Sequence, residues 1–184
     1  MKQSNLKVVA RKEALTTMSE IKRRHFLREK EADQLLDEFS QKLNIDLRQL
    51  LGDKAQVEEA ESSAAKVFFL NNKPLLTLFN NVLVPTMFHE EITSKLPKIV
   101  VNMVAVPHIC NGADLMAPGV VRIEKEYKAN EYVVIVDERH NKPLAVAVAL
   151  TDSATARNTH HGKIAKNIHY VGDNLWAQLK KEHL

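Results

Sequence analysis

The amino-acid sequence predicts an α+β protein, in which an N-terminal α/β region precedes a mostly β-stranded unit with short helices. Three observations predict this class. Between Ala32 and Leu43, apolar residues recur at three- and four-residue spacing, with charged residues on the other face. Residues 64–70 and 74–79 are apolar runs around an Asn-Asn-Lys turn, the pattern of a β-hairpin. After Pro97, short β-branched runs follow one another as in a small barrel or sandwich.

The length of 184 residues suits one ordinary domain or two small ones. Pro97 is the predicted boundary, with one domain over residues 1–97, of which 1–20 are a loose extension, and a second over 98–184. No apolar run approaches the roughly 18 residues of a membrane helix, and the N-terminus has no apolar signal core. We therefore expect a cytoplasmic protein without a membrane partner. The single cysteine, Cys110, excludes an intramolecular disulfide and a cysteine-rich zinc site.

The first half of the chain carries clear start and stop signals. A second, shorter helix is predicted over 46–51, where Asp46 is a suitable N-cap and Gly52 can adopt the left-handed conformation after the helix. Pro85 confines the run VLVPTMF to a sheet edge or ends it. A further short helix is predicted over Glu90–Leu96, because Pro97 disfavours helical backbone at the residue before it.

The second half is predicted to be rich in short β-segments. These cover residues 98–103, 119–124, 131–138, 143–150 and 167–181. Apolar residues occupy both parities of EYVVIVDE and PLAVAVAL, which is typical of strands covered on both faces. Residues 151–167 are polar and predict a long loop of the kind that often carries binding groups.

The stretch HICNGADLMAPGVVRIE combines a helix end, a corner and a strand. A short helix over Val104–Cys110 would end at a left-handed residue in Asn111-Gly112. Pro118 fixes φ, and Gly119 lets the backbone approach a ligand or another strand. Both interpretations of Gly119 stay open at the level of the sequence.

NGADLMAPGV, preceded by KIVVNMVAVPHIC and followed at a distance by NIHYVGDNLW, resembles the PUA domain, a small RNA-binding pseudo-barrel. The first helix, the hairpin KVFFLNNKPLLTLF and the VPTMF segment resemble the pre-PUA domain found in relatives of the malignant-T-cell-amplified-sequence translation factor, in its archaeal form. The likeness covers roughly residues 20 to 180. It implies a pre-PUA α/β domain followed by a PUA pseudo-barrel. The chain departs from the family pattern at Asn102, Val104 and Ala147.

The resemblance implies RNA binding at the glycine-flanked corner, the last loop and the C-terminal strand region. A glycine turn presents backbone N–H groups to phosphates, Lys163 adds a charge, and Leu115 and Met116 could support a sugar or an unstacked base. The alternative is that these two apolar residues are core, the glycines only form turns, and Lys163 is an ordinary surface lysine. The candidate RNA-binding residues are Asn111, Gly112, Ala113, Leu115, Met116, Pro118, Gly119, Val120, Gly162, Lys163, His169 and Tyr170.

The segment from Lys7 to Lys30 carries eight basic residues against three acidic ones. Such a segment can lie along nucleic acid or form a solvated basic face. The sequence leaves open whether Lys22 to Lys30 contacts RNA.

No pattern for catalysis, a cofactor or a metal is visible. His160-His161 lacks the ligand spacing of a metal site, and there is no P-loop, dinucleotide fingerprint or nucleophile elbow. Enzymes with a PUA domain carry their catalytic residues in separate large domains, so the resemblance implies that this chain is not an enzyme.

Three functions are compatible with these observations. The first is a non-catalytic RNA-binding protein of translation, acting in initiation, tRNA release or ribosome recycling. It would bind tRNA or rRNA and the small ribosomal subunit, with a partner similar to density-regulated protein. The second is an accessory RNA-guiding subunit of an RNA-modifying enzyme. The third is a protein-interaction module that has lost RNA binding.

Overall fold

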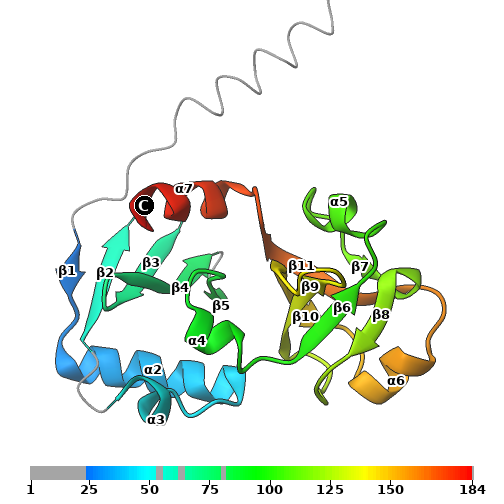
Figure 1. Ribbon diagram of the computed structural model, residues 1–184. Coiled ribbons are helices and arrows are strands. Elements are labelled where there is room, and N and C mark those ends of the chain that lie inside the picture. The colour runs from blue at the N-terminus through cyan, green and yellow to red at the C-terminus, as the bar shows by residue number, and fades with distance from the viewer. Residues whose placement is uncertain (1–23, 53–55, 62–64, 80–81, 184) are drawn as a thin grey trace, which may run out of the picture.

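The computed structural model describes residues 24–52, 56–61, 65–79 and 82–183. Figure 1 shows two parts side by side, an N-terminal sheet with its helices and a β-rich barrel joined to it by the chain after α4. The predicted extension 1–20 and the basic residues before Arg24 lie outside the described residues. Within the described ranges, no helix combines the length and the apolar character that crossing a membrane requires.

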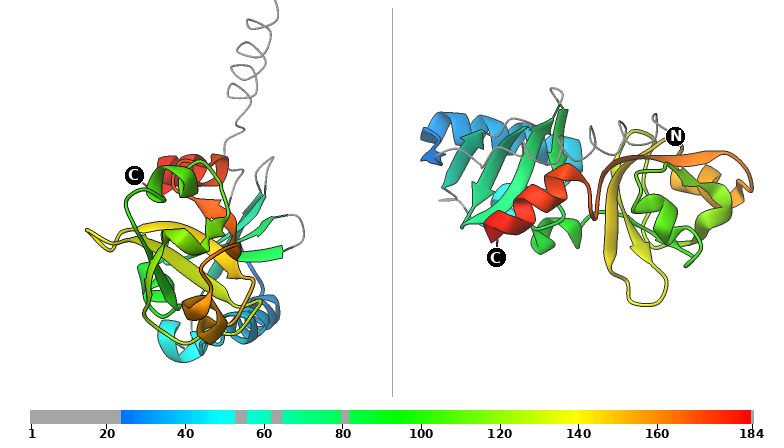
Figure 2. Two further views of the ribbon diagram at one scale, coloured as in Figure 1. Left: turned by 90° about the vertical axis from the view of Figure 1, so that its right-hand side faces the viewer. Right: turned by 90° about the horizontal axis from the view of Figure 1, so that it is seen from above.

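The N-terminal part is a five-stranded antiparallel sheet between helices. Its strands lie in the order β1-β2-β3-β4-β5. Helices α2 and α3 cover one face, and the C-terminal helix α7 covers the other (Figures 1 and 2). The elements are β1 (His25–Phe26), α2 (Glu29–Leu43), α3 (Leu47–Leu51), β2 (Val57–Glu61), β3 (Lys66–Leu70), β4 (Lys73–Phe79), β5 (Val82–Pro85) and α4 (Glu90–Thr93).

Local signals explain most of these elements. The Asp46 side chain accepts a hydrogen bond from the Gln49 N–H at 3.0 Å, so it caps α3 as predicted. Asn71 and Asn72 have φ values of 49° and 64°, which confirms the tight hairpin between β3 and β4. Pro85 lies on β5, which is an edge strand as expected. Helix α4 is shorter than predicted, since it ends at Thr93 rather than Leu96.

The C-terminal part is a six-stranded sheet that curls into a pseudo-barrel. Its strand order is β7-β11-β10-β9-β6-β8, antiparallel except for the parallel pair β6 and β9. The elements are β6 (Lys98–Val101), α5 (Val106–Ile109), β7 (Leu115–Met116), the 3₁₀-helix η1 (Ala117–Gly119), β8 (Val120–Ile123), β9 (Tyr132–Asp137), β10 (Pro143–Ala149), α6 (Ser153–Asn158), β11 (Lys163–Tyr170) and α7 (Asn174–His183).

Two predictions for the last third of the chain were wrong. Residues 151–167 are not a long loop, because Asp152 caps α6 by accepting the Thr155 N–H at 2.8 Å and β11 already begins at Lys163. The β-segment expected over 167–181 ends at Tyr170, after which α7 forms. Asp173 accepts the Trp176 N–H at 2.6 Å, so this residue is a helix N-cap that the strand assignment missed.

The two parts share a hydrophobic core. Along β9, the side chains of Val133 and Ile135 face the barrel interior, whereas those of Val134 and Val136 pack with α2 and the N-terminal sheet. The Tyr132 hydroxyl donates a buried hydrogen bond of 2.5 Å to the carbonyl of Leu83 on β5. The apolar residues on both faces of this strand therefore reflect a barrel packed against a second domain.

Candidate nucleic-acid interface

The predicted corner and the predicted last loop lie side by side in the structure. In the β7–β11 ladder, Met116 pairs with Lys163, although 47 positions separate them in the numbering. Next to this pair, the Ala117 N–H donates to the Gly162 carbonyl at 2.9 Å. The fold thus places both halves of the candidate RNA site on one edge of the barrel.

Lys163 is exposed but already has an anionic partner. Its Nζ lies 2.8 Å from Oδ2 of Asp114, and 59% of its side chain remains accessible. The Lys163 hydrogen bond is the main reason that the pKa of Asp114 lies below its usual value. Oδ1 of Asp114 accepts the Asn167 N–H at 3.1 Å, which fixes the carboxylate. A phosphate would therefore compete with Asp114 for this lysine.

Asn102 forms hydrogen bonds to both residues of the Pro118-Gly119 corner. Its Nδ2 donates to the Pro118 carbonyl at 3.1 Å, its Oδ1 accepts the Ala105 N–H at 3.0 Å, and its backbone N–H donates to the Gly119 carbonyl at 3.0 Å. A Cβ on Gly119 would lie 3.0 Å from the Cβ of Ala105. The backbone at Gly119 therefore approaches Ala105 closely, and Gly119 also lines the groove described below.

Asn167 on β11 forms hydrogen bonds to both ends of the α5–β7 connection. Its Nδ2 donates to the carbonyls of Ile109 at 3.0 Å and Ala113 at 3.1 Å. Sequence reasoning missed the contributions of Asn167 and Asp114, because no local pattern signals contacts between positions so far apart in the chain. For both residues, the signal exists only in the tertiary structure.

The candidate residues divide by exposure. Leu115 and His169 are buried, so direct contact with RNA is not open to them in this structure. The half-buried candidates are Gly112, Gly119, Val120 and Tyr170, and the exposed ones are Asn111, Ala113, Met116, Pro118, Gly162 and Lys163.

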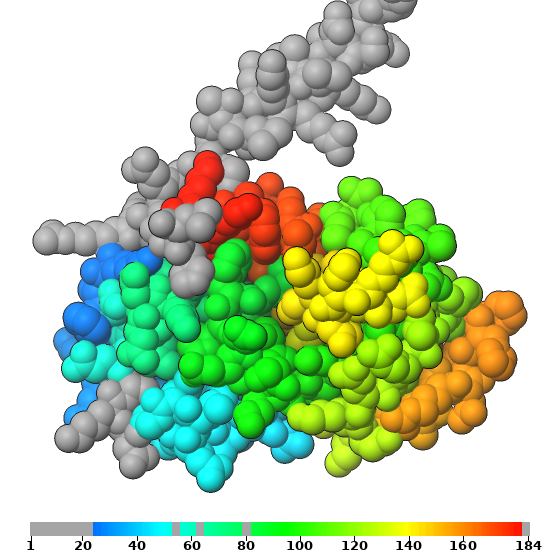
Figure 3. All heavy atoms as spheres, viewed as in Figure 1, coloured from blue at the N-terminus to red at the C-terminus, as the bar shows by residue number. Residues whose placement is uncertain are grey.

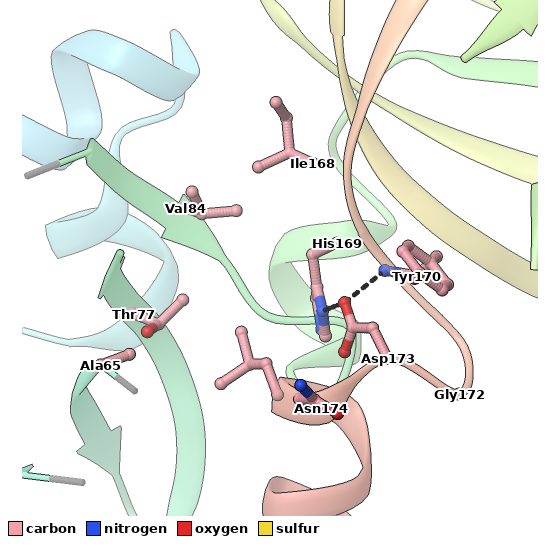
Figure 4. Close-up of a pocket in the computed structure, with 10 residues that line it drawn as sticks. Ala65, Thr77, Val84, Ile168, His169, Tyr170, Gly172, Asp173 and Asn174 are labelled. Atoms are coloured by element: carbon pink, nitrogen blue, oxygen red, sulfur yellow. Dashed lines mark hydrogen bonds and ion pairs between the residues drawn. The ribbon is translucent and has the colours of Figure 1, made fainter. Parts of the chain in front are cut away.

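His169 has a structural partner. Its Nδ1 lies 2.7 Å from Oδ2 of Asp173, which also accepts the Tyr170 N–H at 2.9 Å. Figure 4 shows this cluster beside a cavity of about 350 Å³ between the N-terminal sheet and the turn from β11 to α7. The Trp176 ring of α7 packs near Phe88, which follows β5, with ring centroids 6.3 Å apart. This contact helps to hold α7 against the N-terminal sheet.

An apolar groove of about 390 Å³ lies along the corner. Its exposed rim contains Met116, which is 45% exposed, and Val104, which is 77% exposed. Val104, one of the departures from the family pattern, therefore adds apolar surface to the groove. Ala147, another departure, is fully buried in the barrel core and belongs to no part of the groove.

The described part of the basic segment, residues 24–30, lies away from this groove. Figure 1 places β1 at the end of the N-terminal sheet opposite the barrel. The Arg24 guanidinium stacks 3.7 Å from the Phe69 ring centroid and donates to the Asn72 side chain. Arg28 and Lys30 are exposed. Among the described residues, no group of three or more His, Cys, Asp or Glu side chains is placed to hold a metal ion.

The fold and this corner define a class of protein, a PUA pseudo-barrel preceded by an α/β domain. The model of the PUA domain matches residues 97–171, and the model of the domain of unknown function DUF1947 matches residues 23–89. The PUA domain is an RNA-binding domain.

Known proteins share this arrangement. An uncharacterized protein of Methanocaldococcus jannaschii is 32% identical over 161 residues, which cover 85% of this chain and 97% of that protein. Translation machinery-associated protein 20 of Schizosaccharomyces pombe is 22% identical over 141 residues, 71% of this chain and 76% of that protein. The crystal structure of a hypothetical protein from Pyrococcus horikoshii matches with a TM-score of 0.70 and 29% identity, covering 84% and 98% of the two chains. The chain belongs to the family of stand-alone PUA proteins in which a DUF1947 pre-PUA domain precedes the PUA domain.

Proposed function

We propose that this protein is a non-catalytic RNA-binding protein of the translation apparatus. It binds tRNA or rRNA along the groove at the Gly112–Val120 corner and works in the cytoplasm on the small ribosomal subunit, in initiation, tRNA release or ribosome recycling. A protein similar to density-regulated protein is its proposed partner.

The exposed apolar groove is the observation that carries the RNA-binding proposal. Met116 and Val104 offer apolar surface to a ribose or an unstacked base, and Lys163 is placed beside Met116 to meet a phosphate. Of the twelve candidate residues, the exposed ones make the contacts. Gly112, Leu115, Gly119 and Val120 shape the corner, Tyr170 packs against Gly112, and His169 lies at the β11–α7 turn instead.

The assignment to translation is supported by the name of the Schizosaccharomyces pombe relative, a translation machinery-associated protein. A groove of this size accommodates few nucleotides, which favours the ends or single-stranded turns of a structured RNA over a long sequence. Transfer RNA and ribosomal RNA both offer such features.

The proposal is tested with Met116→Glu, which places a carboxylate where phosphate oxygens approach. Val82→Glu is the matched control, because Val82 is a similarly exposed apolar residue on the N-terminal sheet. Purified wild-type protein and both variants are titrated with labelled tRNA and with small ribosomal subunits. RNA that is cross-linked to each of the three proteins in cells is sequenced. We expect Met116→Glu, but not Val82→Glu, to lose both binding and the cross-links. Equal binding by all three proteins would overturn the placement of the site, and no binding by the wild type would overturn the function.

A further inference from the structure

A second cavity lies on the other side of Pro118 from the apolar groove. It has a volume of about 340 Å³ and opens between β8 and α6, which Figure 3 shows side by side at the end of the molecule farthest from the N-terminal part. Pro118 lines both the cavity and the groove. The two hollows are therefore neighbours across one residue of the corner.

The cavity is cationic. Arg122 from β8, Arg157 from α6 and His160 from the segment after α6 line it, and no carboxylate of the described residues belongs to the lining. The side chains of Arg122 and Arg157 are 47% and 41% exposed, so their guanidinium groups are accessible to a ligand. Two arginines from separate elements around one hollow are suited to an anion with several oxygens, because each guanidinium presents a planar set of donors.

Each arginine also has a carboxylate partner outside the lining. Arg122 contacts Glu124 at 3.1 Å, and Arg157 contacts Glu126 at 2.6 Å. Ion pairs this exposed contribute only about 0–1 kcal/mol. A guanidinium also carries five N–H donors, more than these contacts use. Both arginines can therefore bind an anion in the cavity.

We infer that this cavity is a phosphate subsite for the RNA backbone, holding the phosphodiester next to the nucleoside that lies in the apolar groove. The inference rests on the proposed function and adds the path of the RNA to it. One RNA strand would run from the groove to the cavity and cross the corner over Pro118. The corner would thus separate an apolar subsite for the sugar and base from a cationic subsite for the phosphate.

The test uses the full-length protein and a labelled single-stranded RNA of about ten nucleotides, within the range of lengths that single binding modules cover. Arg122→Gln and Arg157→Gln are each expected to weaken binding about three- to tenfold at low salt. Because both arginines would hold the same phosphodiester, each substitution is also expected to reduce the slope of log affinity against log salt, by no more than about 0.7, the value for one phosphate contact on a single strand. Arg48→Gln is the matched control, because Arg48 lies on the N-terminal part with a side chain that is 38% exposed and with carboxylate partners Asp33 and Asp37.

Glu126→Gln is expected to change RNA affinity in the opposite direction. It removes the negative charge beside Arg157 while keeping a side-chain acceptor for Ser153, so RNA affinity is expected to rise. Thermal unfolding of every variant identifies losses of affinity that come from misfolding. If the two cavity arginine variants keep the affinity and salt slope of Arg48→Gln while Met116→Glu loses binding, the subsite is wrong and the proposed function stands. If the wild type does not bind RNA, both proposals fail.

Discussion

The ring of Tyr170 lies against the backbone of Gly112, so that a Cβ at Gly112 would be only 2.9 Å from Cε1 and the hydroxyl oxygen of the tyrosine. Gly112 also has a φ of 84°, in the left-handed region. Glycine is thus required at this position for two reasons. The backbone is in the left-handed region, and Tyr170 occupies the space that a side chain would need.

Gly112→Ala is therefore expected to destabilise the protein by about 2–5 kcal/mol, the sum of the left-handed penalty and the overpacking cost. Gly162→Ala is the control, because Gly162 has a φ of 90° but no atom of the described residues within 4 Å of its Cβ position. It should lose only about 1–2 kcal/mol. Urea unfolding measures both losses, and equal losses would show that the Tyr170 ring moves aside without cost.

Asn102→Asp is expected to weaken the corner above the carboxyl pKa. An ionised aspartate cannot donate to the Pro118 carbonyl, which Asn102 reaches at 3.1 Å, and its charge repels that oxygen. The expected loss is about 1–3 kcal/mol at neutral pH. It should shrink below about pH 4, where the acid regains a donor hydrogen. Unfolding free energies of both proteins across this pH range give the measurement, and a gap that does not change with pH would contradict the role of the donor.

Tyr132→Phe is expected to cost about 1–3 kcal/mol, because it leaves the buried Leu83 carbonyl without its hydroxyl partner at the junction of the two parts. The matched control is Tyr127→Phe, since the buried Tyr127 hydroxyl has no hydrogen-bond partner among the described residues. That change should be neutral or stabilising.

The same denaturation curves test whether the two parts unfold together. Trp176 fluorescence and far-ultraviolet circular dichroism should follow one transition in the wild type, because the hydrophobic core is continuous between the parts. Two separated transitions would show that the barrel and the N-terminal domain are independent units.

His89 is expected to make stability fall as the pH drops below about 6.5, the ordinary histidine value. The residue is 3% exposed, and burial is the main cause that lowers its pKa; Lys73 lowers this pKa further, and Glu91 opposes the shift. Below pH 6.5 the unfolded chain takes up a proton that the folded protein does not. The loss approaches about 1.4 kcal/mol per pH unit and ends at the folded-state pKa. His89→Gln should remove this slope, and an unchanged slope in the variant would assign it to other groups.

Asp114→Asn is expected to raise RNA affinity if the proposed site is right. It removes the carboxylate that neutralises Lys163, and the asparagine oxygen can still accept the Asn167 N–H. The slope of log affinity against log salt should steepen by up to about 0.7, because Asp114 no longer competes with the phosphate for Lys163. Asp46→Asn, which changes an acidic cap on α3 in the N-terminal part instead, is the control for net charge. A rise of equal size in both variants would point to overall charge rather than Lys163.

The sequence by itself determined the local elements and the class of fold. The apolar spacing from Ala32 to Leu43, the Asp46 cap and the Asn71-Asn72 turn each act within a few residues, and each formed as expected. The predictions at α6 and α7 were wrong because the N-caps Asp152 and Asp173 were not recognised. Asp152 lies in a polar stretch that was predicted to be a loop, and Asp173 lies in a stretch that was predicted to be a strand.

Only the tertiary structure decided which distant residues meet. Met116 pairs with Lys163, Asp114 neutralises that lysine, and Arg122 and Arg157 line one cavity across the corner. Local spacing carries no information on such contacts, because they depend on strand order and on side chains packing from separate elements. For the same reason, the apolar pattern of β9 predicted cover on both faces, but the pattern alone did not identify a second domain as one of the covers.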